Sequence, residues 1–229
     1  MRSHSIALLT LLLTLGGFGT VAFDAVAAEK KRTVHTENKC SISWTSQKAE
    51  ASCASGTVTL YAPERVKGCK SDLKATVLSV VGSLVSVARS EGGMCAGAAH
   101  PYSFRLFEVY DLSNVKGKKA PKVSLYRYFD QAEVQRAIAA DPYITKSKSD
   151  PDAECKYTLT GAEKSFAFHS LQGDQVWVRL GLSHGYEVCR GELTQIAVLL
   201  TPKSKELLAE LKKAAADGRL MNQLAPNYK

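Results

Sequence analysis

Short runs in which apolar and polar residues alternate recur along this chain, and they restrict its fold more than any other feature. The clearest pair lies in the second half, where Phe166-Ala167-Phe168 leads to a turn at Gln172-Gly173-Asp174 and then to residues 176–180. Alternation with a period of two is typical of strands that bury one face, and a Gly-Asp turn between two such runs predicts a β-hairpin. Residues 193–200 are apolar enough for a further strand, which we expect at the centre of a sheet.

The first half of the chain shows the same pattern. Two short runs alternate in the manner of half-buried strands, residues 41–44 and 57–61. Residues 72–81 and 84–89 are ambiguous, because one continuous helix would also bury an apolar stripe. Their valine and serine content and the Gly82-Ser83 break favour two strands in a hairpin. Residues 102–112 alternate aromatic and polar side chains and predict another strand.

Two helices are predicted by their start signals. Asp130 offers a capping carboxylate, Glu133 follows three residues later, and an apolar face precedes Pro142, which we expect to end the helix. Thr201 with Pro202 at the first helical position predicts a last helix, whose inner stripe is Leu207, Leu208 and Leu211.

The order of these elements predicts the fold class. Runs of strands with two helices, and no strand-helix-strand repeats, indicate an α+β domain in which two helices pack against a mainly antiparallel sheet. Residues 145–154 are rich in Lys, Ser, Asp and Pro and are predicted to form a flexible loop.

The N-terminus has the features of a secretory signal peptide at residues 1–28. Arg2 precedes an apolar run that ends in Ala25-Val26-Ala27-Ala28, a suitable cleavage site. We expect a polar arm at residues 29–39, one α+β binding domain at 40–216 and a C-terminal tail at 217–229. The protein is then periplasmic or secreted, with no membrane span after cleavage.

The cysteine count fits this export. Six cysteines all follow the predicted signal peptide, and none forms a Cys-x-x-Cys pair. In an oxidising compartment an even number indicates disulfides, although fifteen pairings of six cysteines exist. We favour Cys40 with Cys53, Cys69 with Cys95, and Cys155 with Cys189, because each pair closes a hairpin or joins neighbouring strands.

The charge of the chain restricts its partners. The formal net charge is +8 at pH 7, and the predicted signal peptide contributes one charge of each sign, Arg2 and Asp24, so the mature protein keeps that value. A field of this sign speeds encounter with anionic partners. Because the protein is exported, we expect no nucleic-acid partner.

The segment from Cys95 to Phe129 is similar to a known family. It contains Gly97-Ala98-Ala99-His100-Pro101, an alternating run, a Lys116-Gly117-Lys118 reversal and Val123-Ser124-Leu125 before a helix. This order resembles the extracellular lysozyme-sensing domain of anti-sigma-V factors, also found at the N-terminus of some wall polysaccharide deacetylases. Phe168, Tyr186 and Gly191 match its closing half. Ala98 stands where the family usually has glycine, and the six cysteines lie outside the family pattern.

The resemblance implies a surface that binds a protein ligand. Tyr186 is the expected contact residue, flanked by His184 and Glu187, because an exposed aromatic ring with a polar tip is a good interface anchor. His100 is a further ligand-binding candidate, although a histidine before proline more commonly fixes its own turn. His184 and Cys189 lack the spacing of a zinc site, so no metal is expected.

The sequence offers no catalytic motif. It has no Gly-x-Ser-x-Gly elbow, no papain-like cysteine and no His-Glu-x-x-His helix, and the catalytic domain of the deacetylases has no counterpart in it. We expect a non-enzymatic exported binding module of the cell envelope, without a cofactor, that grips a lysozyme-like protein or an anionic wall polymer. The alternative is an envelope hydrolase or transferase with an unrecognised active site.

Overall fold

The computed structural model describes residues 31–62, 67–99, 101–115, 120–149, 157–158, 161–184 and 195–228. The first four strands are β1 (Arg32–His35), β2 (Ser41–Trp44), β3 (Ala49–Cys53) and β4 (Gly56–Tyr61). Three long strands follow, β5 (Cys69–Val81), β6 (Leu84–Cys95) and β7 (Tyr102–Asp111). The remaining strands are β8 (Tyr157–Thr158), β9 (Phe166–Gln172), β10 (Gln175–Gly181), β11 (Ser183–His184) and β12 (Gln195–Leu200). The helices are α1 (Gln131–Ala139), α2 (Pro142–Ser149), α3 (Lys205–Ala216) and α4 (Met221–Leu224), with 3-10 turns η1 (Leu112–Asn114), η2 (Leu125–Arg127) and η3 (Ala162–Lys164).

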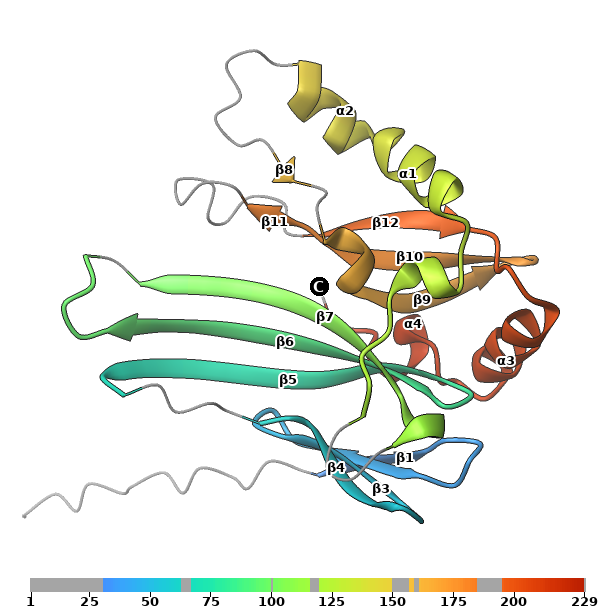
Figure 1. Cartoon of the computed structure of the whole chain (residues 1–229), viewed down its shortest axis with the longest axis horizontal. Helices are drawn as coiled ribbons and strands as arrows, with labels where there is room; N and C mark the ends of the chain where they lie inside the picture. The colour runs from blue at the N-terminus through green and yellow to red at the C-terminus, as the bar shows by residue number, and fades with distance from the viewer. Residues whose placement is uncertain are drawn as a thin grey trace, which may run out of the picture.

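These strands form stacked antiparallel sheets. The N-terminal sheet has the order β1-β2-β3-β4, the central sheet β5-β6-β7 and the C-terminal sheet β12-β10-β9, while β11 and β8 form a short ladder. The central sheet lies between the other two, and helices cover the C-terminal sheet (Figure 1). The fold is therefore α+β with mainly antiparallel sheets, as the alternating runs predict.

Buried side chains fill the spaces between these layers. The C-terminal sheet packs against α1 and α3 around Phe129, Phe166 and Phe168, and the rings of Phe166 and Phe168 meet edge to face at 5.7 Å. Ile42 and Val58 of the N-terminal sheet pack against apolar side chains of the central sheet. On the other face of the central sheet, Phe107 lies in a smaller cluster with residues of β9 and α4.

The predicted hairpin at residues 72–89 is confirmed and is longer than expected. β5 and β6 pair from Cys69 opposite Cys95 to Val81 opposite Leu84. Gly82 forms the turn with φ of +55°, and a Cβ placed there would lie 2.5 Å from the Glu210 carboxylate. The opposite end of the central sheet, residues 69–74, 90–95 and 102–105, extends past the strands of both flanking sheets (Figure 1). We call this end the arm.

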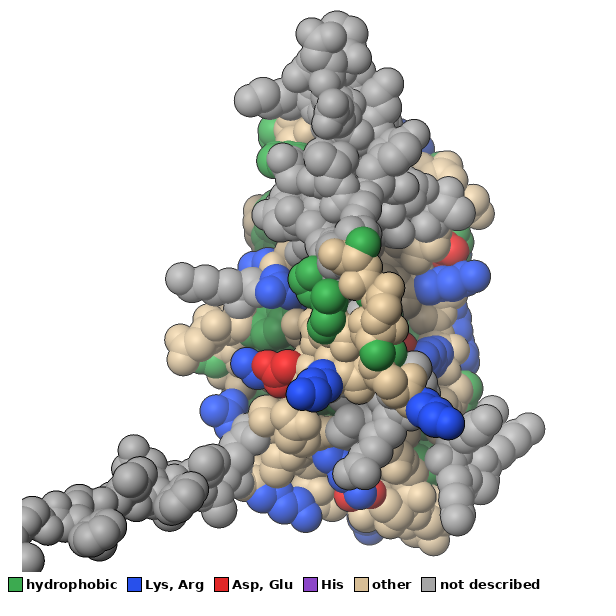
Figure 2. Space-filling view, turned by 90° about the vertical axis from the view of Figure 1, so that its left-hand side faces the viewer, with side chains coloured by type: hydrophobic (Ala, Val, Ile, Leu, Met, Phe, Trp, Pro, Cys, Tyr) green, Lys and Arg blue, Asp and Glu red, His purple; other side chains and the backbone are tan. Residues whose placement is uncertain are grey.

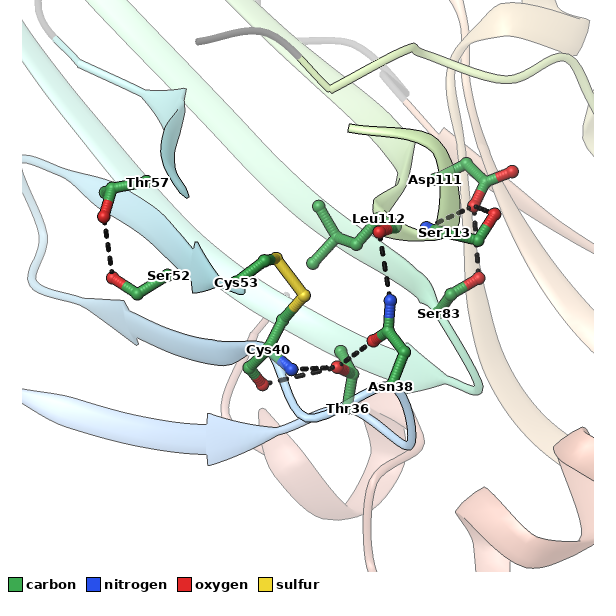
Figure 3. Close-up of a disulfide and its surroundings, with 10 residues drawn as sticks. All are labelled: Thr36, Asn38, Cys40, Ser52, Cys53, Thr57, Ser83, Asp111, Leu112 and Ser113. Atoms are coloured by element: carbon green, nitrogen blue, oxygen red, sulfur yellow. Dashed lines mark hydrogen bonds between the residues drawn. A yellow bond between two sulfur atoms is a disulfide. The ribbon is translucent and has the colours of Figure 1, made fainter. Parts of the chain in front are cut away.

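Two of the favoured disulfides are confirmed. Cys69 is bonded to Cys95 at the tip of the arm, and Cys40 to Cys53 across the ends of β2 and β3. Cys155 and Cys189 lie outside the described residues. Figure 3 shows Cys40 beside Thr36, while Asn38 of the same turn donates to the Leu112 carbonyl at 3.0 Å. The disulfide thus joins β2 to β3 within the N-terminal sheet, and the hydrogen bond holds this turn to η1, directly after β7.

Two parts of the N-terminal region differ from the prediction. Residues 32–35 belong to β1, which pairs with β2 through Val34 and Ile42. The expectation that the N-terminal segment at residues 29–39 is disordered or loosely docked is therefore wrong for these residues. β3 was not predicted, because Ala49-Glu50-Ala51-Ser52 lacks the β-branched side chains that mark strands. β3 is thus specified by the neighbouring strands rather than by its own composition, and β1 is too short to stand out from the polar residues around it.

The expected central position of residues 193–200 is wrong in the described sheet. β10 is the central strand there, and β12 pairs with β10 alone. Ile196, Val198 and Leu200 are buried while Ala197 is exposed, so β12 has one buried face. α1 packs beside β12, which explains why an edge strand is so apolar.

The two predicted helices are present, with changes at their ends. The Asp130 carboxylate accepts from the Glu133 amide at 2.9 Å, as expected of a cap. Pro142 follows the end of the first helix, as predicted, but it is also the first residue of α2. At the start of α2 the Asp141 carboxylate accepts a hydrogen bond from the Tyr143 amide. The loop expected at residues 145–154 is therefore helical as far as Ser149.

At the last helix, Ser204 is the capping residue instead of Thr201, and its hydroxyl accepts from the Leu207 amide. Pro202 instead forms a bridge with Phe129. The segment expected as a tail is packed against the domain, because Leu220 and Met221 are buried. The Tyr228 ring lies 6.1 Å from that of Phe107.

Candidate functional site

The structure describes little of the region that the resemblance indicates. Tyr186, Glu187 and His100 lie outside the described residues. His184 is in β11, where it pairs with Tyr157 of β8. The grouping of the four predicted ligand-binding residues therefore stays a prediction, and the candidate site is built from side chains that the structure describes.

Two buried acids on one face of the central sheet are the first candidates. Glu108 of β7 is 8% exposed, and Lys122 forms an ion pair with it. The Tyr110 hydroxyl lies 2.7 Å both from Glu108 Oε2 and from the Leu60 carbonyl oxygen. Burial raises the pKa of Tyr110 most, and the hydrogen bond to the Glu108 carboxylate raises it further. The hydroxyl therefore stays protonated and is a hydrogen-bond donor.

The second acid has a similar environment. Glu91 is 7% exposed, and Arg89 Nη2 lies 3.3 Å from its Oε2. The Arg89 guanidinium also lies 5.0 Å from the centre of the Tyr61 ring of the N-terminal sheet. Each acid thus forms an ion pair with a cationic side chain, and each cluster connects the central sheet to the N-terminal sheet. Such a hydrogen-bonded network stabilises the packing of the two layers. We assign this cluster a structural role.

The opposite face of the central sheet carries basic side chains. Lys74, Ser90 and Arg105 stand in register across β5, β6 and β7, and Lys70 stands opposite Met94 nearer the tip. Alternation places these residues on the face that also presents Phe107 to β9 and α4. Asp72 lies on the same face between the two lysines of β5, and its carboxylate is 3.7 Å from Lys74 Nζ. Figure 2, which looks at this end of the molecule, shows more Lys and Arg than Asp and Glu side chains.

Arg179 continues the basic face onto the C-terminal sheet. It lies in β10 opposite Ala167 of β9, and Ala167 is in the same buried cluster as Phe107. Burial lowers the pKa of Arg179; Tyr228 opposes this effect, and the positive charge of Arg105 adds to it. Its Nε is buried without a hydrogen-bond partner, and no carboxylate pairs with it among the residues that the structure describes. Lys70, Lys74, Arg105 and Arg179 are hereafter the basic face.

Two neutral groups border Arg179. Tyr228 packs over Phe107, and the Arg105 guanidinium lies 5.7 Å from its ring centre. Burial raises the pKa of Tyr228 although Arg105 and Arg179 oppose this, and its buried hydroxyl has no hydrogen-bond partner. His169 of β9 lies 2.9 Å from the Ser170 hydroxyl through Nδ1. Burial and then Arg179 lower the pKa of His169, so its imidazole is neutral at pH 7.

The sequence analysis missed Arg105, Arg179 and Tyr228. Arg179 lies within the alternating run at residues 176–180, and Arg105 within the run at residues 102–112. Period-two alternation does place Arg179 on the side of β10 opposite Val178 and Leu180, and Arg105 on the Phe107 side of β7. What it cannot show is that β7 and β10 bring those two sides together across the layers.

Chemically, the basic face is suited to negatively charged groups. The part of the chain that the structure describes contains no group of three or more His, Cys, Asp or Glu side chains suited to hold a metal ion. Within the same residues, no helix is both long and apolar enough to cross a membrane. The two disulfides are typical of proteins that fold in an oxidising compartment.

The sequence matches no protein-family model, and no curated protein is significantly similar to it. The resemblance to lysozyme-sensing domains therefore stays a prediction.

Proposed function

We propose that this protein is a non-catalytic binding module, exported to the periplasm or beyond, that holds an anionic polymer of the cell envelope on its basic face. The observation that supports this best is the row of basic side chains on one face of the arm. Lys70 and Lys74 are both exposed, and one acid, Asp72, lies between them. An anionic chain laid along this row meets cations from two layers of the fold.

The physical reason is electrostatic. Exposed lysines attract a polyanion over about 8 to 10 Å at physiological ionic strength, and each contact is weakened by salt. The net charge of +8 adds a general attraction of the same sign. A bound polymer is therefore expected to dissociate as salt rises, and removal of basic-face lysines should reduce that dependence.

A lysozyme-like protein is the second proposed partner, on the resemblance of residues 97–129 alone. Animal-type lysozymes are basic, so such a partner would have to present an acidic patch against an unfavourable overall field. A protein interface anchored by an aromatic side chain such as Tyr186 keeps most of its affinity in salt. The salt response therefore separates the two partners.

Calorimetry on the mature protein tests the proposal, with purified acidic envelope polymer and purified lysozyme titrated separately. The variant Lys70→Gln/Lys74→Gln removes two charges from the basic face. Lys39→Gln/Lys205→Gln removes two exposed charges from the N-terminal turn and from α3. Both variants carry the same net charge, so a difference between them reports the position of the lysines.

We expect polymer binding that falls steeply between low and physiological salt and is weakened about tenfold by Lys70→Gln/Lys74→Gln, but much less by the control. Equal weakening in both variants would show that net charge alone attracts the polymer. Binding of lysozyme with salt-resistant affinity, and no binding of polymer, would replace the anionic polymer by the protein partner.

A further inference from the structure

We infer that Arg179, Tyr228 and Arg105 form a specific site for one oxyanion, a carboxylate or a phosphate, at the inner end of the basic face. The inference rests on the proposed function only for the origin of that group, because the site itself can be tested with free anions. It differs from the exposed lysines in being half-buried and built from groups of three separate segments.

The first argument is the state of the hydrogen-bond donors. Arg179 Nε and the Tyr228 hydroxyl are both buried, and neither has a hydrogen-bond partner among the residues that the structure describes. A buried donor without an acceptor costs free energy, and most such groups in folded proteins are satisfied. Two of them in one place indicate that an acceptor from outside the protein completes the arrangement.

The second argument is that these donors are close together. Arg179 stands opposite Ala167, and Ala167 packs in the cluster that Tyr228 covers. The charge of Arg179 also acts on Tyr228, as does that of Arg105, whose guanidinium lies against the Tyr228 ring. The guanidiniums of Arg105 on β7 and Arg179 on β10 thus both act on Tyr228, in the segment after α4.

The third argument is charge. Arg179 and Arg105 repel each other, and no carboxylate pairs with Arg179 among the described residues. His169 also adds no negative charge. A ligand that offers acceptor oxygens to Arg179 is therefore best an anion, since the charge of Arg179 attracts an anion and repels a cation. The planar guanidinium edge binds two oxygens at once, which favours carboxylate or phosphate.

A side chain on the neighbouring strand is suited to the same ligand. Gln195 of β12 stands opposite Gly181, while Ala197 stands opposite Arg179, so Gln195 lies on the same face of the sheet two residues along. Its Oε1 is buried without a hydrogen-bond partner. Rotation of this amide by half a turn would direct its two N–H donors to the position of Oε1, and would add a donor to the site.

The test is a titration of the mature protein with phosphate, glycerol phosphate, acetate and glucuronate, each at constant ionic strength. Amide and imidazole NMR signals of His169, Arg179 and Tyr228 report binding at the site. The variants are Arg179→Gln, Arg179→Lys and Tyr228→Phe. Arg136→Gln is the matched control, because Arg136 is exposed on α1, outside the basic face.

We expect saturable shifts in the millimolar range for at least one anion class, weakened about tenfold by Arg179→Gln and unchanged by Arg136→Gln. Arg179→Lys keeps the charge but loses the planar edge, so it should bind more weakly than the native protein, and Tyr228→Phe should weaken binding about threefold. Preference for phosphate or for carboxylate assigns the source. If Arg179→Gln fails to fold, the other two variants decide.

Absence of saturable shifts at high millimolar anion, or equal weakening in Arg136→Gln, would overturn the site. The proposed function can fail separately. Small anions that bind through Arg179, with no binding of polymer, would leave the site valid and remove the polymer. Polymer binding that depends on Lys70 and Lys74 but is unaffected by Arg179→Gln would leave the function valid and remove the oxyanion site.

Discussion

The disulfide at the tip of the arm provides the sharpest prediction on stability. Cys69 and Cys95 are 26 residues apart in sequence and stand opposite each other in the first register pair of β5 and β6. Replacement of both by alanine releases a loop of this length in the unfolded chain. The chain-entropy relation then gives a loss of about 3.5 kcal/mol at 25 °C. The same relation gives about 2.9 kcal/mol for the 13-residue separation of Cys40 and Cys53.

Urea denaturation of the native protein and of Cys69→Ala/Cys95→Ala, followed by circular dichroism, measures this loss. Because the tip lies beyond the flanking sheets, amide exchange should also accelerate at residues 69–74 and 90–95 while residues 77–87 stay protected. A loss below about 1 kcal/mol, or faster exchange throughout the central sheet, would refute the reasoning.

Three further predictions concern the packing around the central sheet. Gly82→Ala should destabilise the protein by about 1 to 2 kcal/mol through the left-handed backbone at φ +55°, and more through contact of the new methyl group with Glu210. Thermal melts of Gly82→Ala and of Gly82→Ala/Glu210→Ala separate the backbone effect from the contact. Burial raises the pKa of Glu210, and the charges of Glu37 and Asp111 raise it further, so the folded state binds this proton more tightly than the unfolded chain. The free energy of unfolding therefore falls as pH rises through the raised pKa. By urea denaturation, Glu210→Gln should be about 0.5 kcal/mol more stable than the native protein at pH 7 and equally stable at pH 3. The lowered pKa of His169 has the opposite consequence, since the unfolded chain takes up the proton first as pH falls below about 6.5. Below that pH the native protein should lose stability relative to His169→Asn. Parallel stability profiles of the native protein and His169→Asn against pH would contradict this.

Much of the fold follows from local sequence, and the exceptions share a physical cause. The hairpins at Gly82 and Gly173 and the cap at Asp130 are set by residues that are neighbours in the chain, so alternation and turn chemistry predict them. β1 is short and lies in a mainly polar segment, and β3 lacks β-branched residues; both form because β2 and β4 offer paired backbone and a buried face. The position of β12 depends on α1, which is distant in sequence.

The candidate site shows the same limit. Lys70 and Lys74 lie four residues apart in β5, with Asp72 between them, so period-two alternation alone places both lysines on one strand face. Arg105, Arg179 and Tyr228 meet only because β7, β10 and the segment after α4 pack together, and no local pattern reports such a contact. Tyr186, Glu187 and His100, which were chosen on resemblance, remain predictions because the structure does not describe them.

The central claim is that an anionic ligand lies on the basic face. Amine footprinting tests it directly: the mature protein is acetylated with and without saturating acidic envelope polymer, and the rate at each lysine is read by mass spectrometry. Lys70 and Lys74 should be protected while Lys39 and Lys205, exposed on other elements, react as fast as before. Protection of all four lysines to the same extent, or of Lys39 and Lys205 alone, would contradict the account.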